Sequence, residues 1–221
     1  MPRPVIRARQ AFSRGAFCAM FSVMSHFRIL ALFIGLSVFA LPAMAREGDE
    51  AGVAVEKLTP QQQREESLDV LFARLQQSAS ETIARDVEQK IWTLWSQSDS
   101  PTADVLLRQA VAAMDAQDSA SSFAILDRVI ASYPSYAEAW NKRATLNFMV
   151  GKYKASLNDI EKVLDLEPRH FGALAGRGMI YNAQEEWSLA LDAYRDALAV
   201  NPNMPSVKSA IKELEKRLQD I

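Results

Sequence analysis

Cysteine and histidine are almost absent from this 221-residue sequence, and their scarcity limits the chemistry that it can carry. The only cysteine, Cys18, lies among the first 45 residues, so the rest of the chain has no disulfide, no thiolate metal site and no cysteine nucleophile. Beyond that segment there is one histidine, His170, on which any histidine-dependent nucleophile would have to rely. We expect His170 to be an exposed or packing residue of a turn, and keep a catalytic role as the alternative.

Glycine is also scarce, and the sequence contains no phosphate-binding glycine loop, nucleophile elbow or metal-ligand spacing. Gly172, Gly176 and Gly178 lie at helical spacing beside alanines, so we expect them to permit close helix contact. The neighbouring carboxylates Glu185 and Glu186 fall in an expected turn, where solvation is the default. The sequence therefore predicts no enzyme activity, no cofactor and no metal site.

Acidic residues are missing from residues 1–45, which contain five arginines. Residues 29–41 are apolar (ILALFIGLSVFAL), follow Arg28 and are followed by the small-residue sequence that ends at Ala45. This order is typical of a secretory signal peptide cleaved after Ala45, and the apolar run is shorter than the roughly 20 residues of a membrane span. We predict export to the bacterial periplasm, with no stable membrane span after cleavage. Met24 is an alternative start to Met1, and a mitochondrial destination is the alternative compartment.

The rest of the chain, residues 46–221, is acidic. It holds all 27 aspartates and glutamates, whereas five of the 25 lysines and arginines lie before it. Binding to nucleic acid requires a basic surface that meets the phosphates, so this composition argues against nucleic acid as the main partner. Residues 46–59 are polar and contain two glycines. This segment is predicted to be a flexible linker.

A fixed period dominates the second half of the chain, where Pro134, Pro168 and Pro202 are equally spaced. Bulky and small residues recur in the same order before each proline. The residues 28 positions before the prolines are bulky (Leu106, Trp140, Leu174), and so are those 8 positions before them (Leu126, Ile160, Tyr194). The residues 24 positions before the prolines are small (Ala110, Ala144, Gly178), and so are those 12 positions before them (Ser122, Ser156, Ala190). Such a period indicates a stacked array of repeats. Small residues allow two helices to approach closely, and the proline ends the second helix.

This pattern resembles the tetratricopeptide repeat (TPR), a helix–turn–helix unit of about 34 residues. The aromatic residue expected 21 positions before the proline is present as Tyr181 but is replaced by Asn147 and Ala113 in the other two units. The resemblance implies an all-α fold, a right-handed α-solenoid of antiparallel helix pairs. We place its repeats at residues 103–136, 137–170 and 171–204, with helices at 102–116 and 119–132, 136–149 and 152–166, and 170–184 and 186–199.

Two flanking helical segments complete the predicted architecture. Residues 60–102 are expected to form a hairpin whose first helix starts at Thr59-Pro60, a hydroxyl N-cap followed by proline. It lacks the repeat proline, so it is either a degenerate repeat or a capping hairpin. Its Trp92 and Trp95 are expected to pack in the core or between repeats, with a functional aromatic pair as the alternative. Residues 205–221 are predicted to be an amphipathic capping helix.

The segments LFARL, Trp92-x-x-Trp95, AWNKRA and EPRHFGAL are similar to those of a group of small exported TPR proteins of proteobacteria. That likeness favours the architecture and the compartment, and it implies no activity.

In TPR proteins the first helix of each repeat lines a concave groove, and by resemblance we predict a protein-binding groove here. Its residues would be Leu107, Arg108, Val111, Asn141, Lys142, Thr145, Phe148, Ala175, Met179 and Asn182. This mixture of apolar and polar side chains suits an extended peptide or a partner helix. Asn141, Lys142 and Arg108 also resemble part of the set with which some TPR domains clamp a carboxylate, but the full set is absent, so the clamp is a minor hypothesis.

Two arginines one period apart, Arg143 and Arg177, are further candidates for ligand contact. We expect Arg143 to form an internal ion pair with Asp159, and we expect no clear partner for Arg177. The resulting hypothesis is a non-catalytic scaffold that binds a peptide or helix of an envelope protein. The alternative is a structural protein that associates with itself, as a homo-oligomer, at the membrane surface.

Overall fold

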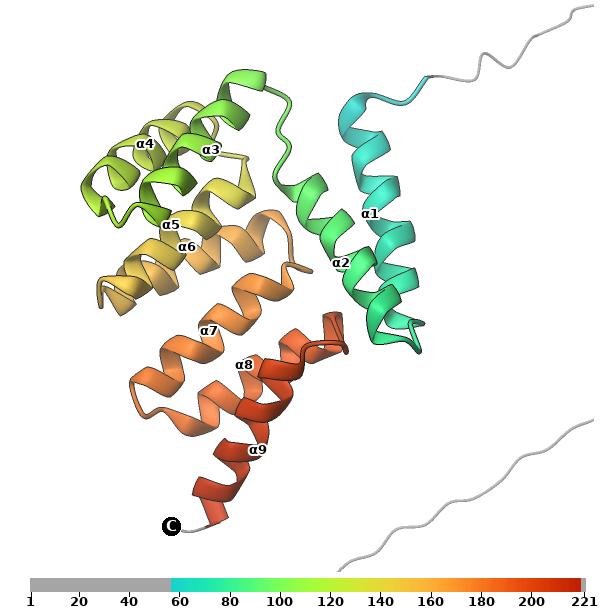
Figure 1. Ribbon diagram of the computed structural model, residues 1–221, viewed down its shortest axis with the longest axis vertical. Coiled ribbons are helices and arrows are strands. Elements are labelled where there is room, and N and C mark those ends of the chain that lie inside the picture. The colour runs from blue at the N-terminus through green and yellow to red at the C-terminus, as the bar shows by residue number, and fades with distance from the viewer. Residues whose placement is uncertain (1–56, 220–221) are drawn as a thin grey trace, which may run out of the picture. The chain divides into compact units, whose positions relative to one another are not determined.

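The computed structural model describes residues 57–219, which form helices joined by short turns and contain no strand within that range (Figure 1). The helices are α1 (Pro60–Gln76), α2 (Glu81–Trp95), α3 (Pro101–Asp115), α4 (Ser119–Ser132), α5 (Ala137–Met149), α6 (Tyr153–Leu166), α7 (Phe171–Ala183), α8 (Trp187–Val200) and α9 (Pro205–Gln219). The predicted signal peptide, the alternative start Met24 and residues 46–56 of the predicted linker lie outside the described residues. Within residues 57–219, no helix combines the length and the apolar character needed to cross a membrane.

Helices α3 to α8 form the predicted all-α solenoid, and their ends lie within one residue of the expected positions. The two helices of each repeat pack against each other, and the second helix of one repeat packs against the first helix of the next. Small residues bring the paired helices together as expected. Ser156 donates a hydrogen bond of 2.7 Å to the backbone oxygen of Ala144, and a Cβ on Gly178 would lie 2.5 Å from the ring of Tyr194.

The turn between the two helices of each repeat has the same backbone shape three times. Gln117, Gly151 and Glu185, which occupy equivalent positions in successive repeats, have φ angles of 60°, 73° and 63°. A positive φ is easy for glycine and unfavourable for other residues. The repeat therefore retains this turn even where the sequence does not supply the residue best suited to it.

Helix α9 continues the stack beyond α8. Its buried Val207 and Leu214 share a core cluster with Leu191 and Tyr194 of α8. Lysines and glutamates occupy its exposed side, so α9 covers the end of the array in the way that the amphipathic pattern predicts.

The hairpin of α1 and α2 does not stack on α3 as a preceding repeat would. Its core cluster includes Phe171 at the start of α7 and Met204 in the turn after α8, and it contains no residue of α3. Gln76 at the end of α1 donates hydrogen bonds of 2.7 and 2.8 Å to the backbone oxygens of Ala199 and Val200. The hairpin therefore packs against the turns that connect successive repeats.

Equivalent positions of the repeats make these contacts. Tyr136, His170 and Met204 lie one period apart, and each is the second residue after a repeat proline. The Tyr136 hydroxyl donates a hydrogen bond of 2.7 Å to the backbone oxygen of Ser96, the His170 ring stacks on Trp95 with centroids 4.1 Å apart, and Met204 packs against the hairpin core. The hairpin thus meets the same position in three successive turns.

Candidate protein-binding site

Five of the ten predicted groove residues line one pit between α5, α6 and α7. These are Asn141, Thr145, Phe148, Ala175 and Met179, and the pit has a volume of about 150 Å³. The structure therefore brings together predicted groove residues of α5 and α7. Whether these residues bind a partner stays a prediction.

The other predicted groove residues lie outside the pit. Leu107 is only 3% exposed and belongs to the core of the first repeat, whereas Arg108 and Asn182 are exposed and Val111 is half-buried. Lys142 is engaged with Glu138, because its Nζ lies 2.8 Å from Oε1 of that carboxylate. Lys142 is therefore not a free cation that could serve in a carboxylate clamp.

The pit has apolar walls and a few polar groups. Ala144, Ile160, Ala173 and Gly176 complete its apolar lining, and Met179 at its edge is 47% exposed. A Cβ on Gly176 would lie 3.6 Å from Cδ1 of Ile160, which is an ordinary contact, so the missing side chain at this position leaves usable space. Here the expectation that glycine serves close helix contact is not met.

Asn141 is the polar residue best placed to recognise a ligand. Its Nδ2 donates a hydrogen bond of 3.0 Å to Oε2 of Glu138, and this contact fixes the amide and leaves its oxygen as an acceptor. Thr145 beside it donates a hydrogen bond of 3.0 Å to the backbone oxygen of Asn141. A largely apolar hollow with a few oriented polar groups is typical of a ligand-binding site.

A buried cluster of charged and polar side chains connects α5 to the start of α7, next to the pit. His170 is fully buried; its Nδ1 accepts the backbone N–H of Ala173 at 3.0 Å, and its Nε2 lies 3.1 Å from Oε2 of Glu138. The proton must therefore be on Nε2 and is donated to the carboxylate. Both ring nitrogens are occupied, which leaves none for a substrate. His170 is therefore a packing residue of the turn, in agreement with the expectation of an exposed or packing residue.

Glu138 is 1% exposed and would be costly to ionise without its neighbours. Burial alone would raise the pKa of Glu138, but the hydrogen bond from His170 and the positive charge of Lys142 hold it below its ordinary value. The carboxylate is therefore charged at neutral pH. It connects α5 to the start of α7, because the His170 side chain also caps that helix.

The two tryptophans of the hairpin pack against this cluster, as the first of the two interpretations predicted. Trp92 makes edge contacts with Trp95, His170 and Phe171, with ring centroids 5.2 to 5.4 Å apart. A Cβ on Gly172 would lie 2.5 Å from the Trp92 ring. Glycine is needed at position 172 because the hairpin occupies the space where a side chain would be.

The two arginines on the first helices are both paired. Arg143 forms the predicted ion pair with Asp159, with N···O distances of 3.0 and 2.6 Å, and also contacts Asp127 at 2.8 Å. The expectation that Arg177 has no partner was wrong, because its guanidinium lies 2.7 Å from Asp196. That partner is displaced by about one helical turn from the position equivalent to Asp159, so a comparison at equal repeat positions missed it.

Residues 150–205 match the tetratricopeptide-repeat family. A TPR repeat-containing protein of Rhizobium etli is 34% identical over 199 residues, which cover 90% of this chain and 95% of that protein. The chain belongs to the TPR repeat proteins. Sperm-associated antigen 1 of Rattus norvegicus is 31% identical over 93 residues, which cover 42% of this chain and 10% of that protein.

Solved structures share the fold at low identity. The Sgt2 TPR domain of Aspergillus fumigatus has a TM-score of 0.52 and 16% identity, and the match covers 55% of this chain and 82% of that chain. The first TPR of Spaghetti (RPAP3), bound to the HSP90 peptide SRMEEVD, has a TM-score of 0.52 and 18% identity over 55% of this chain and 96% of that chain. MamA has a TM-score of 0.51 and 16% identity, and the match covers 74% of this chain and 86% of that chain. TPR domains are protein–protein interaction modules.

Proposed function

We propose that this protein is a non-catalytic scaffold that binds an extended segment of another protein across α5 and α7. The observation that carries this proposal is the pit between α5, α6 and α7, which offers apolar walls beside the fixed amide of Asn141. A cavity of about 150 Å³ has room for one benzene-sized group. The partner would therefore insert a single apolar side chain.

The polar groups at the pit would orient the partner's backbone. Because Nδ2 of Asn141 is engaged by Glu138, the amide oxygen is the group that would accept a backbone N–H of the partner. Phe148 and Met179 would lose exposed apolar surface in the complex, which contributes about 25 cal/mol per Å² to binding. The peptide complex of the RPAP3 domain supports the choice of a peptide segment as the ligand class.

The carboxylate clamp is the less favoured form of this proposal. Lys142 is paired with the buried Glu138, and Arg108 does not line the pit with Asn141. An internal segment with an apolar side chain fits the pit better than a chain end bearing a carboxylate.

We also propose that the protein acts in the periplasm, on a partner of the cell envelope. The apolar run at residues 29–41 and the small residues that end at Ala45 support export. N-terminal sequencing of the protein recovered from the periplasmic fraction tests this, and the expected first residue is Arg46. Recovery in the cytoplasmic fraction with residues 1–45 still attached would contradict it.

The binding proposal is tested by filling the pit. Gly176→Leu places a side chain in the hollow, and crosslinking in intact cells followed by mass spectrometry then identifies the captured proteins. We expect a specific partner with the unchanged protein and its loss with Gly176→Leu. The matched control is Ala131→Leu, which adds a leucine at an exposed position of α4.

Circular dichroism must show that both variants are folded. If Gly176→Leu and the control capture the partner equally, the pit is not part of the binding site. Recovery of only the protein itself would favour the alternative, a self-associating structural protein.

A further inference from the structure

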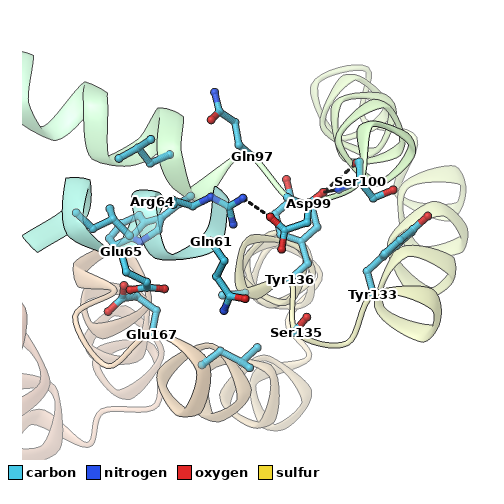
Figure 2. A pocket seen from close by; sticks show the side chains of 16 residues that line it. Gln61, Arg64, Glu65, Gln97, Asp99, Ser100, Tyr133, Ser135, Tyr136 and Glu167 are labelled. Atoms are coloured by element: carbon cyan, nitrogen blue, oxygen red, sulfur yellow. Dashed lines mark hydrogen bonds and ion pairs between the residues drawn. The ribbon is translucent and has the colours of Figure 1, made fainter. Parts of the chain in front are cut away.

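Two hollows of this molecule differ in whether their polar groups are already paired. The larger one, about 430 Å³, lies between the hairpin and the turn that joins α4 to α5 (Figure 2). Figure 2 shows Arg64 reaching toward Asp99, and the two groups are 2.6 Å apart. The Glu167 carboxylate in the same lining is held by Arg169 at 3.1 Å. The pit between α5, α6 and α7 instead keeps one polar atom open, the side-chain oxygen Oδ1 of Asn141.

The contacts of the Asn141 amide place this oxygen. Its Nδ2 donates a hydrogen bond of 3.0 Å to Oε2 of Glu138, which is 1% exposed and does not line the pit. Oδ1 accepts no hydrogen bond from the described residues, and it is not closed off from solvent. Only 7% of Asn141 is exposed, and the residue lines the pit. The nitrogen end of the amide therefore faces the protein, and the oxygen end is open to the pit.

A chain of hydrogen bonds that begins at the backbone fixes this orientation. The N–H of Ala173 donates to Nδ1 of His170 at 3.0 Å, so the ring hydrogen is on Nε2, which lies 3.1 Å from Oε2 of Glu138. A charged carboxylate can only accept hydrogen bonds. Turning the Asn141 amide over would therefore set its oxygen against Oε2, and two acceptors in contact inside the protein are costly.

We propose that Glu138 is a positioning residue for the pit, and that through Asn141 it makes the pit select ligands with an N–H donor beside an apolar group. This inference rests on the proposed function and adds the specificity of the same site. A ligand that offers only an acceptor at this place meets Oδ1 without a hydrogen between them. Proline has no backbone N–H, so it should be disfavoured at the partner residue that faces Asn141.

The test uses two small probes of nearly the same size, acetanilide and phenyl acetate. Both carry a benzene ring for the pit, and the N–H of acetanilide is replaced in phenyl acetate by an ester oxygen. The purified ¹⁵N-labelled protein is titrated with each probe, and the backbone amide signals of Gly176 and Met179, which line the pit, report binding there. We expect acetanilide to bind about three- to tenfold more tightly, because one hydrogen bond is added.

Three variants separate the orientation of the amide from the shape of the pit. Asn141→Leu removes the oxygen, so the two probes should bind equally. Glu138→Met removes the acceptor that holds Nδ2, so the amide is free to turn over and the preference should fall below about twofold.

The matched control is Glu138→Gln. The Nε2–H of His170 requires an oxygen opposite it, so the glutamine oxygen takes the place of Oε2 and still accepts from Asn141. Lys142 is 29% exposed and can turn toward solvent when its partner oxygen is replaced by an amide nitrogen. The preference for acetanilide should therefore persist in this variant.

Circular dichroism must show that Glu138→Met is folded. If it is not, the double variant Glu138→Gln with His170→Asn takes its place. Asparagine is a good N-cap for α7 but has no Nε2–H to orient the glutamine. Lys142 then attracts the glutamine oxygen, the glutamine nitrogen meets Asn141, and the preference should again be lost.

The outcomes distinguish this inference from the proposed function. If the unchanged protein binds both probes equally, the selection of an N–H donor is wrong but the pit remains a binding site. Persistence of the preference in Glu138→Met, or its loss in Glu138→Gln, would show that Glu138 does not position the amide. If neither probe moves the signals of the pit, or if Gly176→Leu binds both probes as tightly, the proposed function fails together with the inference.

Discussion

The α1–α2 hairpin and the α5–α6 pair are both antiparallel helix pairs, but different contacts fix their positions. Between α5 and α6 the contacts are short and polar: Asp159 accepts hydrogen bonds from Arg143 and Asn147, and Ser156 bonds to the backbone of Ala144. The hairpin adds aromatic packing, in which Trp92 and Trp95 surround His170 and Phe171, to hydrogen bonds such as those from Gln76 to the end of α8. Pairing within one repeat places α5 against α6, whereas contacts between residues far apart in the sequence place the hairpin.

The largest expected effect comes from removing the aromatic contact. Trp95→Ala deletes a core side chain of the hairpin and should lower the free energy of unfolding of that region by about 4 kcal/mol. Because α5 and α6 are also held together by the contacts of Asp159 and Ser156, hydrogen exchange should accelerate in α1 and α2 and remain slow in α5 and α6.

The control for that variant is Leu189→Ala, which truncates a side chain that is 48% exposed on α8. It should leave both regions protected. Uniform acceleration of exchange in Trp95→Ala would mean that the hairpin and the repeats unfold as one unit.

The complementary change breaks the polar contacts of α5–α6. Arg143→Ala leaves the buried carboxylate of Asp159 without its cation and should cost about 3 kcal/mol, measured by chemical denaturation. Asp127→Asn is the control, because this partner of Arg143 is 59% exposed and its loss should cost less than about 1 kcal/mol. Equal costs for the two variants would refute the dominance of the buried pair.

A smaller effect on stability should distinguish Gly172 from Gly176, which both lie on α7. Gly172→Ala forces Trp92 to move and should destabilise the protein by about 1–2 kcal/mol. Gly176→Ala meets only an ordinary contact and should stabilise α7 by up to about 1 kcal/mol, because alanine is the better helix former. Thermal unfolding of both variants measures the contrast, and a shift of the same sign in both would contradict it.

The smallest effect is confined to acid. The pKa of Glu138 lies below its ordinary value of 4.5 in the folded protein, so its ionised form stabilises the fold above the unfolded-state pKa. That stabilisation is lost as the pH falls through the folded-state pKa. The difference in stability between the unchanged protein and Glu138→Gln should be constant near neutral pH and shrink below about 4.5. If the difference in stability persists in strong acid, the packing of the Glu138 side chain and not its charge provides the stabilisation.

The sequence predicted the parts of the fold that repeat. The equal spacing of Pro134, Pro168 and Pro202 located each helix of the array, and the pairing of Arg143 with Asp159 followed from helix register. Half of the predicted groove residues came together in one pit for the same reason. Regular spacing carries this information because each repeat contacts its neighbours in the same way.

The position of the hairpin could not be predicted in that manner. It depends on contacts between residues far apart in the sequence, such as Tyr136 with Ser96 and Asn203 with Leu75. One signal was present in the sequence: the large residues Tyr136, His170 and Met204 recur at the same place after each repeat proline. Large side chains at the same turn position in three repeats predict a shared contact surface along that edge.

The contact of one hairpin with three successive turns affects how the array can deform. A solenoid bends or twists like a spring when each repeat rotates slightly against the next. Here Tyr136, His170 and Met204 all contact the same hairpin, so a change in the rotation between repeats would strain or break at least one of these contacts. The curvature of the array, and with it the width of the proposed groove, would consequently be set before a partner arrives. Binding in the proposed groove would then cost less conformational entropy of the scaffold, and a segment too wide for the groove would not be accommodated by stretching it.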